Sequence, residues 1–318
     1  MPDYLAVRVA RRERLATDIL GLTLAPIEAS SLPPATPGSH IDVTLPNGLV
    51  RQFSIVAHTA AGYELAILRE ASGRGGSRSV HDDVVTGDVL RISPPRNLFP
   101  MATGASRSLL FAGGIGITPI LAMAEALAAQ GAAFELHYCT RSAQRCAFLA
   151  RLAQAPYANR VHLYHDDNPA TGRLDLASLL SKSTPSQHLY VCGPEGFMEH
   201  VLSLARGAGW QEANLHAERF HAAPVMAADD GSFEITLARS GRRIWVAADQ
   251  TAIAALHAAG VTVPMSCEQG ICGTCATRVL DGEIDHRDMF FTDAERAAGN
   301  QFTPCCSRAR GAGLVLDL

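Results

Sequence analysis

The cysteines have the most informative spacing in this sequence. Five of the eight lie in the last sixth of the 318-residue chain, as Cys267-x4-Cys272-x2-Cys275 followed by the adjacent pair Cys305 and Cys306. Four thiolates at this spacing can bind the two irons of a plant-type [2Fe–2S] cluster. Structural zinc is the alternative, but zinc sites prefer two short C-x2-C hooks, and the sequence contains one. The spacing therefore favours an iron–sulfur cluster.

Two glycines, Gly270 and Gly273, lie between these ligands, and glycine lets backbone amides approach the cluster sulfurs closely. The remaining cysteines, Cys139, Cys146 and Cys192, are isolated along the chain. Because the N-terminus shows no apolar export signal, a disulfide framework is not expected.

A second set of residues could bind a flavin. Arg51, Gln52, Phe53 and Ser54 open a predicted strand. The arginine could hold a flavin phosphate, and the aromatic ring two residues later, on the same side of the strand, could stack on the flavin. The serine hydroxyl could donate toward flavin N5. Alone, these four residues also fit an ordinary strand with a solvated arginine.

The run GRGGS at residues 73–77 strengthens the flavin hypothesis. The backbone amides of Gly75, Gly76 and Ser77, together with Arg74, could form a nest for a phosphate. A flexible surface loop is the alternative for this run taken by itself.

A third set of residues is suited to a dinucleotide. Gly113, Gly114 and Gly116 lie between an apolar strand and a helix expected to start near Thr118. The run is not the G-x-G-x-x-G fingerprint. It still offers free amides at a helix N-terminus, where a pyrophosphate can bind.

Two further strand ends belong with this motif. Cys192, Gly193 and Pro194 end a second apolar strand, and Thr140 and Arg141 follow another. In a doubly wound sheet, ligands bind in the crevice at these carboxyl ends. An isolated cysteine there can also be a simple core residue. An arginine in the ribose position could bind the 2′-phosphate of NADPH, whereas an acidic residue would favour NADH.

Three histidines, His137, His162 and His165, lie in or near predicted strands. The sequence shows no metal-binding arrangement around them, so they are interpreted as structural residues.

The three sets of residues fall in three regions of the chain, each of which we expect to form its own domain. Short alternating strands in the first hundred residues predict an antiparallel barrel. Strand–helix alternation then predicts a doubly wound parallel α/β sheet. A hairpin, a helix and the cysteine-rich loop follow, which predicts a β-grasp-like ferredoxin domain. The expected boundaries are residues 1–103 for the barrel, 104–222 for the nucleotide domain, 223–231 for a linker and 232–318 for the ferredoxin domain.

Composition excludes other classes of protein. The net charge of −4 at pH 7 favours neither nucleic acid nor an anionic membrane as a partner. The longest uncharged apolar run, residues 109–124, is short and interrupted by glycines and a proline. We therefore expect a cytoplasmic protein.

On these motifs the sequence resembles the phthalate dioxygenase reductase family, including the vanillate demethylase reductases. The resemblance covers essentially the whole chain and includes Ser266-Cys267-Glu268, Cys272-Gly273-Thr274-Cys275, Asp285-His286-Arg287-Asp288, Ser307-Arg308 and residues 314–318. It implies that Cys305, two residues before the Ser-Arg pair, is the fourth cluster ligand and that Cys306 is a buried apolar side chain. The family's usual tyrosine is replaced by Phe53, which keeps the stacking face and lacks the hydroxyl.

The resemblance also implies cofactors and further site residues. The GRGGS run matches the branch that binds FMN, with FAD as the alternative, and the Thr-Arg pair matches a branch that uses NADH, with NADPH as the alternative. Thr118 would lie close to both cofactors, and Cys192 would pack near the nicotinamide C4. The backbone of Ala66, Ile67 and Leu68 would line the flavin ring edge, and Phe220 would approach the flavin from the next domain.

The expected function is that of a reductase component of a Rieske-type aromatic-ring oxygenase or O-demethylase. Electrons would pass from NADH through FMN to the cluster and then to the oxygenase, with a monomeric reductase. The alternatives are a reductase for a haem or di-iron hydroxylase, and a redox-sensing protein without an oxygenase partner.

Overall fold

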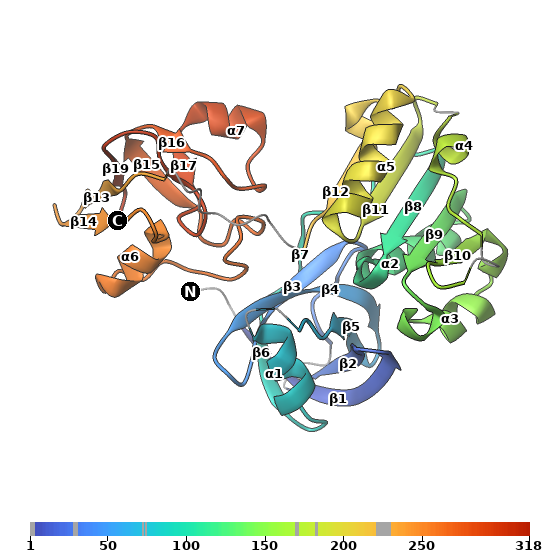
Figure 1. Ribbon diagram of the computed structural model, residues 1–318. Coiled ribbons are helices and arrows are strands. Elements are labelled where there is room, and N and C mark those ends of the chain that lie inside the picture. Colours follow the sequence, from blue (N-terminus) through green and yellow to red (C-terminus); the bar gives the residue numbers. More distant parts are fainter. Residues whose placement is uncertain are drawn as a thin grey trace. The chain divides into compact units, whose positions relative to one another are not determined.

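A computed structural model describes residues 4–27, 31–71, 73, 75–168, 172–181, 184–220 and 230–318. The chain divides into two compact units, Met1–Arg219 and Phe220–Leu318. Each unit is described by itself below (Figure 1). The three-module boundaries expected from the sequence remain a prediction, and most of the expected linker at residues 223–231 lies outside the described residues.

The first unit opens with an antiparallel barrel. Its strands are β1 (Leu5–Ala16), β2 (Ile19–Pro26), β3 (Ser39–Thr44), β4 (Val50–Thr59), β5 (Gly62–Leu68), β6 (Val89–Ile92) and β7 (Arg96–Asn97). The strand order is β4-β5-β2-β1-β6-β3, and pairing of β3 with β4 closes the ring, while β7 adds to β3. Alternation of exposed and fully buried residues, as at Val7 and Val9 in β1, fills the barrel interior.

One helix interrupts the barrel strands. α1 (Gly76–Asp83) follows β5 and begins within the GRGGS run, which was expected from the sequence to be a nest or a loop. Gly75 precedes the helix with φ of +89°, a left-handed conformation that favours glycine. The run is therefore a helix N-terminus, and its first amides have no partner within the helix.

The second half of this unit is a parallel sheet. Its strands are β8 (Arg107–Gly113), β9 (Phe134–Thr140), β10 (Val161–His165), β11 (Gln187–Cys192) and β12 (Leu215–Glu218), in the order β10-β9-β8-β11-β12. The connecting helices are α2 (Ile117–Ala129), α3 (Leu149–Gln154), α4 (Leu176–Leu180) and α5 (Glu195–Gly207), with short 3₁₀ turns η1 (Gly114–Gly116), η2 (Ala143–Arg145), η3 (Ala158–Arg160) and η5 (Glu212–Asn214).

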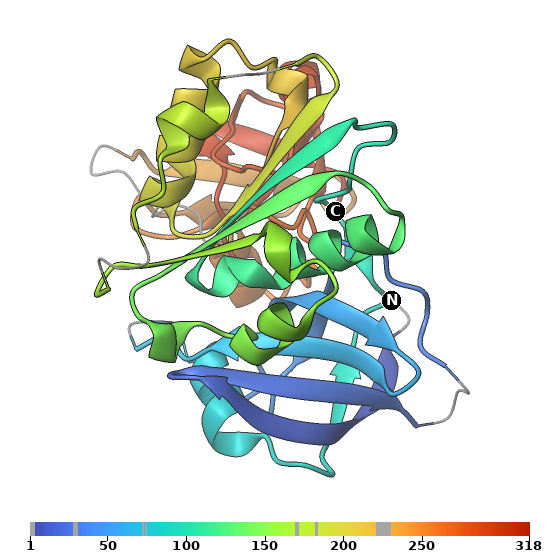
Figure 2. The same ribbon diagram turned by 90° about the vertical axis from the view of Figure 1, so that its right-hand side faces the viewer.

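Helices cover both faces of this sheet. α2 packs against β8, β9 and β11 and also against barrel strand β4, so it joins the sheet to the barrel (Figure 2). On the other face, buried residues of α4 and α5 form one core with Leu109, Phe111, Leu189 and Val191 of β8 and β11. Arg151 of α3 contributes to the junction with the barrel, because its guanidinium pairs with Glu64 of β5 and Glu125 of α2.

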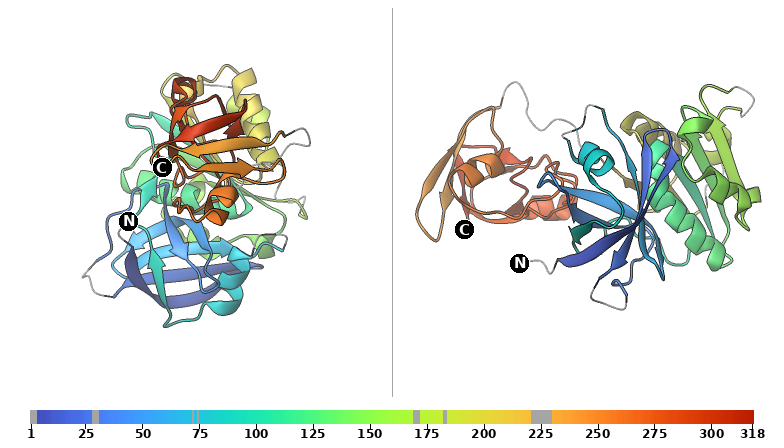
Figure 3. Two further views of the ribbon diagram at one scale, coloured as in Figure 1. Left: turned by 90° about the vertical axis from the view of Figure 1, so that its left-hand side faces the viewer. Right: turned by 90° about the horizontal axis from the view of Figure 1, so that it is seen from below.

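The second unit is a small mixed sheet with one helix packed on it (Figure 3). Its elements are β13 (Phe233–Leu237), β14 (Arg243–Val246), α6 (Ala252–Ala258), β15 (Thr277–Asp281), β16 (Ile284–Asp285), α7 (Asp293–Ala298), β17 (Gln301–Phe302), β18 (Arg308–Ala309) and β19 (Gly313–Leu316). The order β14-β13-β19-β15-β17 places the last strand parallel to the first, as in a β-grasp fold. The cysteine-rich loop lies between α6 and β15.

Within the described part of the chain, we find no helix with the length and apolar character needed to cross a membrane.

Candidate functional site

The predicted phosphate cradle is assembled from β4 and α1. A Cβ added to Gly76 would lie 2.5 Å from Cγ of Arg51, so the arginine side chain lies directly on the first turn of α1. Arg51 Nη1 also donates to the Val50 carbonyl at 2.7 Å. A guanidinium beside the amides of a helix N-terminus is suited to a phosphate. The predicted phosphate ligand Arg74 lies outside the described residues.

The turn before α1 is tied to its surroundings by polar contacts. The Ser77 hydroxyl accepts a hydrogen bond from the Glu70 amide at 3.0 Å, and Asn47 Nδ2 donates to the Gly75 carbonyl at 3.3 Å. These contacts fix the position of the two predicted amide donors, Gly76 and Ser77, relative to the barrel.

The next three residues of β4 are the predicted contacts of the flavin ring. Phe53 is half-buried and packs against the barrel core, and Ser54 is only 7% exposed. Gln52 Nε2 is buried and has no hydrogen-bond partner among the described residues. A buried unpaired amide donor costs about 1–3 kcal/mol. An acceptor on a bound flavin would remove this cost, so the residues present fit the cofactor.

The third predicted flavin contact is the end of β5. Ala66 and Leu68 pair with β2, whereas the register of β5 with β4 ends at Ile55 opposite Leu65. The two strands therefore separate beside residues 66–68, which leaves one backbone edge there unpaired with β4. The Ile67 carbonyl is already in contact with His81 Nε2 at 2.9 Å, so we expect Ala66 and Leu68 to offer the free groups.

The glycines of the nucleotide motif permit a close approach between two loops. A Cβ on Gly116 would lie 2.2 Å from the Cys192 carbonyl oxygen, and a Cβ on Gly193 would lie 2.8 Å from Cα of Gly113. A side chain at any of these positions would separate the loops. The structure thus brings together, at the carboxyl ends of β8 and β11, two motifs that are about eighty residues apart in sequence.

Other predicted nucleotide residues lie at the same edge of the sheet. Thr118 is buried at the start of α2, where its hydroxyl donates to the Ile115 carbonyl at 3.0 Å. At the end of β9, Thr140 Oγ1 is 2.7 Å from His165 Nδ1, which gives His165 the polar partner expected of a structural histidine. Arg141 directly follows β9 and is exposed, so its side chain is accessible to the adenosine part of a dinucleotide. Pro194 is also exposed.

Glu218 is a site residue that the sequence did not single out. It pairs in register with Cys192, which is fully buried. The residue as a whole is partly exposed, but its Oε2 is buried without a hydrogen-bond partner among the described residues. Burial raises the pKa of this carboxyl to about 8, and burial together with the charge of Glu218 raises the pKa of the Cys192 thiol. An acidic residue ending an apolar strand was the signal that could have found it.

The cysteines of the second unit form two contacting pairs. The Cys267 thiol contacts that of Cys272, and the Cys275 thiol contacts that of Cys305. Two pairs of sulfurs are the donor set that two irons require, so the residues fit the cluster. Cys306 contacts Cys305 but also lies 3.0 Å from Thr303 Oγ1 and is 1% exposed.

Backbone amides point at the sulfurs of the loop. Cys267 Sγ accepts from the amides of Gln269 and Ile271, and Cys272 Sγ accepts from that of Thr274, each at 3.4 Å. The turns depend on glycine: Gly270 has φ of +71°, and a Cβ there would lie 2.4 Å from Cys306 Sγ. Such amides stabilise negative charge on cluster sulfurs.

A buried polar network holds the segment that follows the loop. Asp288, 3% exposed, accepts from the amides of Phe290 and Phe291 and from the Ser307 hydroxyl, and the Met289 amide donates to the Gly270 carbonyl. The Asp285–Asp288 and Ser307-Arg308 motifs thus support the cluster loop from outside it.

Two of the three histidines interpreted as structural residues lie beside a carboxylate in the fold. Glu135, His137 and His162 lie together, with possible ligand atoms within 4.8 Å of one another. The sequence did not show this grouping, because it depends on the strand register that joins β9 to β10. The interpretation of the histidines as structural residues stays a prediction.

Comparisons with known proteins agree with this architecture. Residues 235–310 match the 2Fe-2S iron-sulfur cluster binding domain family, and residues 89–215 match the N-terminal domain of dimethylamine monooxygenase subunit DmmA-like proteins. The vanillate O-demethylase oxidoreductase of Pseudomonas sp. strain HR199 is 51% identical over 98% of this chain and 99% of its own. The crystal structure of phthalate dioxygenase reductase is 38% identical over 99% of this chain and 98% of its own, with a TM-score of 0.77.

This chain belongs to the family of vanillate O-demethylase oxidoreductase and phthalate dioxygenase reductase. It also matches an intact type IV self-sufficient cytochrome P450 monooxygenase, with 39% identity and a TM-score of 0.85, over 99% of this chain and 41% of that one. Family membership confirms the expected fold and the chemistry of an electron-transfer oxidoreductase, and the matched domain family supports the [2Fe–2S] cluster. Phe220 begins the second unit, so its contact with the flavin stays a prediction.

Proposed function

We propose that this protein is the reductase component of a Rieske-type oxygenase that demethylates or hydroxylates an aromatic compound, and that it acts as a monomer in the cytoplasm. The observation that carries the proposal is the pair of thiol contacts, Cys267–Cys272 and Cys275–Cys305, on a chain that also has a flavin barrel and a nucleotide sheet. The family relatives, named as reductases of vanillate demethylase and phthalate dioxygenase, support the same assignment.

The site residues divide into four groups. For the phosphate of FMN we propose Arg51, Arg74, Gly75, Gly76 and Ser77, and for its ring we propose Gln52, Phe53, Ser54, Ala66, Ile67, Leu68 and Phe220. For NADH we propose Gly113, Gly114, Gly116, Thr118, Thr140, Arg141, Cys192, Gly193 and Pro194. For the cluster we propose Cys267, Cys272, Cys275 and Cys305. Ser54 and Cys192 are the proposed catalytic residues, because they would flank the hydride path.

The chain's own groups position the reaction. A bound flavin accepts hydride and releases single electrons, which the protein cannot do by itself. The Ser54 hydroxyl, buried in β4, would hold the flavin N5 in place. The packed loops at Gly116 and Cys192 would hold the nicotinamide against the flavin and exclude water from the transfer path.

The proposed partner class is tested by measuring which protein accepts electrons from the reductase. The holoprotein and NADH are mixed anaerobically with the purified terminal oxygenase of a vanillate O-demethylase, and bleaching of its Rieske absorbance is followed. We expect reduction of the Rieske centre that depends on NADH and on both proteins. Vanillate turnover under air should follow.

A haem acceptor is the second candidate, favoured by the match to the self-sufficient P450 chain. If a haem protein is reduced rapidly while the Rieske oxygenase is not, the proposed partner class is wrong. Failure to reduce any protein acceptor, with normal ferricyanide reduction, would instead favour a sensing role.

A further inference from the structure

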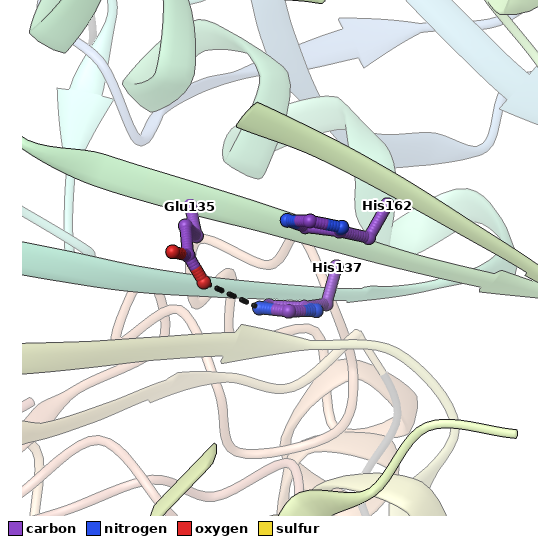
Figure 4. A group of neighbouring side chains, drawn as sticks. All are labelled: Glu135, His137 and His162. Atoms are coloured by element: carbon purple, nitrogen blue, oxygen red, sulfur yellow. Dashed lines mark ion pairs between the residues drawn. The ribbon is translucent and has the colours of Figure 1, made fainter. Parts of the chain in front are cut away.

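A group of polar side chains lies on the nucleotide sheet, outside the proposed electron path (Figure 4). Glu135 and His137 are two residues apart on β9 and so share a face of the sheet. His162 of the edge strand β10 pairs directly opposite His137. The two imidazole rings stack with centroids 4.8 Å apart, and in Figure 4 both rings present a nitrogen toward the Glu135 carboxylate.

The two ring nitrogens of His137 differ in their hydrogen bonding among the described residues. Its Nδ1 lies 3.1 Å from the Tyr164 hydroxyl. Its side chain is 2% exposed, and its Nε2 forms no hydrogen bond within the described part of the chain. The nearest charged group is Glu135, whose Oε2 forms an ion-pair contact with Nε2 at 3.5 Å, longer than an ordinary hydrogen bond. This nitrogen is therefore aimed at a carboxylate oxygen.

The second carboxylate oxygen of Glu135 is bound by the side chain of Arg107. Arg107 Nη2 donates to Oε1 at 2.6 Å, and this leaves Oε2 facing His137. Ligating carboxylates and histidines usually have their second atom fixed by such an outer hydrogen bond. Here Arg107 fixes the carboxylate, and Tyr164 can fix His137 by accepting from Nδ1–H, which leaves the Nε2 lone pair free.

The buried Nε2 of His137 and Oε2 of Glu135 therefore face each other. An imidazole nitrogen beside a carboxylate oxygen is a pair of donors that a metal ion can bind.

We propose that Glu135, His137 and His162 bind one divalent transition-metal ion of the zinc or copper type. Imidazole and carboxylate are ligands that these ions accept, in contrast to the thiolates of the iron–sulfur loop. With bonds of about 2.1 Å and tetrahedral angles, two ligands on one zinc ion lie roughly 3.4 Å apart. The 3.5 Å between His137 Nε2 and Glu135 Oε2 matches this spacing.

The third ligand requires a small adjustment. The ligand atoms lie within 4.8 Å of one another, so the His162 ring must move and tilt by about 1–1.5 Å to complete the site. His162 can do so because β10 is the edge strand of the sheet. A water molecule would fill the fourth position. The ion would link β10 to β9 and so stabilise the edge of the nucleotide sheet.

The first experiment measures zinc binding directly. Zn²⁺ is titrated calorimetrically into the tag-free holoprotein, with the iron content checked before and after. We expect one Zn²⁺ per chain, and we expect Glu135→Gln and His162→Ala each to weaken binding on the order of tenfold or more. His188→Ala is the matched control, because His188 stacks on His216 elsewhere in the sheet, and it should bind zinc like the parent protein.

A second readout does not depend on the variants' folding. Cu²⁺ is added to the oxidised holoprotein, whose cluster and flavin are both diamagnetic, and its electron paramagnetic resonance spectrum should show coupling to two imidazole nitrogens. The proposal is overturned if zinc fails to bind at a one-to-one ratio, or if it binds equally well to both ligand variants. It is equally overturned if zinc uptake is matched by iron release, or if the copper spectrum lacks nitrogen coupling.

Discussion

Replacement of Glu218 by glutamine should make the stability of the first unit less sensitive to a rise in pH from about 5 to about 8. The carboxyl oxygen Oε2 of Glu218 is buried beside Cys192, and burial raises the pKa from 4.5 to about 8. The unfolded chain therefore releases this proton near pH 4.5, whereas the folded chain retains it up to about pH 8. Unfolding is favoured increasingly as pH rises through this window, and the cost is constant above it.

The size of the effect follows from the pKa difference. A shift of about 3.5 pKa units corresponds to roughly 5 kcal/mol at about 1.36 kcal/mol per unit, which is an upper bound because the residue as a whole is partly exposed. For a unit of this size, 1 kcal/mol changes Tm by roughly 2–4 °C. The parent protein should lose on the order of 10 °C more than Glu218→Gln between about pH 5 and about pH 8.5.

The assay follows thermal release of FMN fluorescence and the far-UV circular dichroism of both proteins across this pH range. Glu212→Gln is the control, since Glu212 is exposed and its hydrogen bond to Arg206 lowers its pKa, opposite to the shift at Glu218. Parallel pH profiles for the parent protein and Glu218→Gln would refute the assignment of a neutral buried carboxyl beside Cys192.

Three further outcomes are expected. Cys305→Ser should lose the cluster while Cys306→Ser keeps it, because Cys305 is the thiol in contact with Cys275; iron content and the visible spectrum decide, and a reversed result would contradict the assignment. Arg51→Ala should weaken FMN binding about 10- to 100-fold through loss of a charged hydrogen bond, measured by equilibrium dialysis, and unchanged affinity would remove Arg51 from the phosphate site. A chain ending at Ala227 should still bind FMN, oxidise NADH and reduce ferricyanide but fail to reduce an oxygenase, because the two units have separate cores; loss of flavin bleaching in anaerobic stopped flow would show that they are not independent.

The sequence alone determined the parts of this protein that depend on local geometry. Three of the four proposed cluster cysteines lie within nine residues, together with Gly270. A loop this short has few ways to turn its amides toward the sulfurs. The glycines at 113–116 likewise predict a strand-to-turn-to-helix connection. Alternation of apolar residues was sufficient to predict the barrel, because burial of one face imposes a period on each strand. The order of apolar strands and helices was sufficient to predict the parallel sheet.

Only the tertiary structure decided which distant side chains meet. The pairing of Cys192 with Glu218, of Gly116 with the Cys192 carbonyl, and of His137 with His162 depends on the register between strands separated by 25 or more residues. Register is set by the packing of whole faces against the barrel and helices, and a shift of one residue would reverse every side chain. Local sequence carries no record of that choice, so the buried Glu218 carboxyl and the buried His137 nitrogen became visible only in the fold.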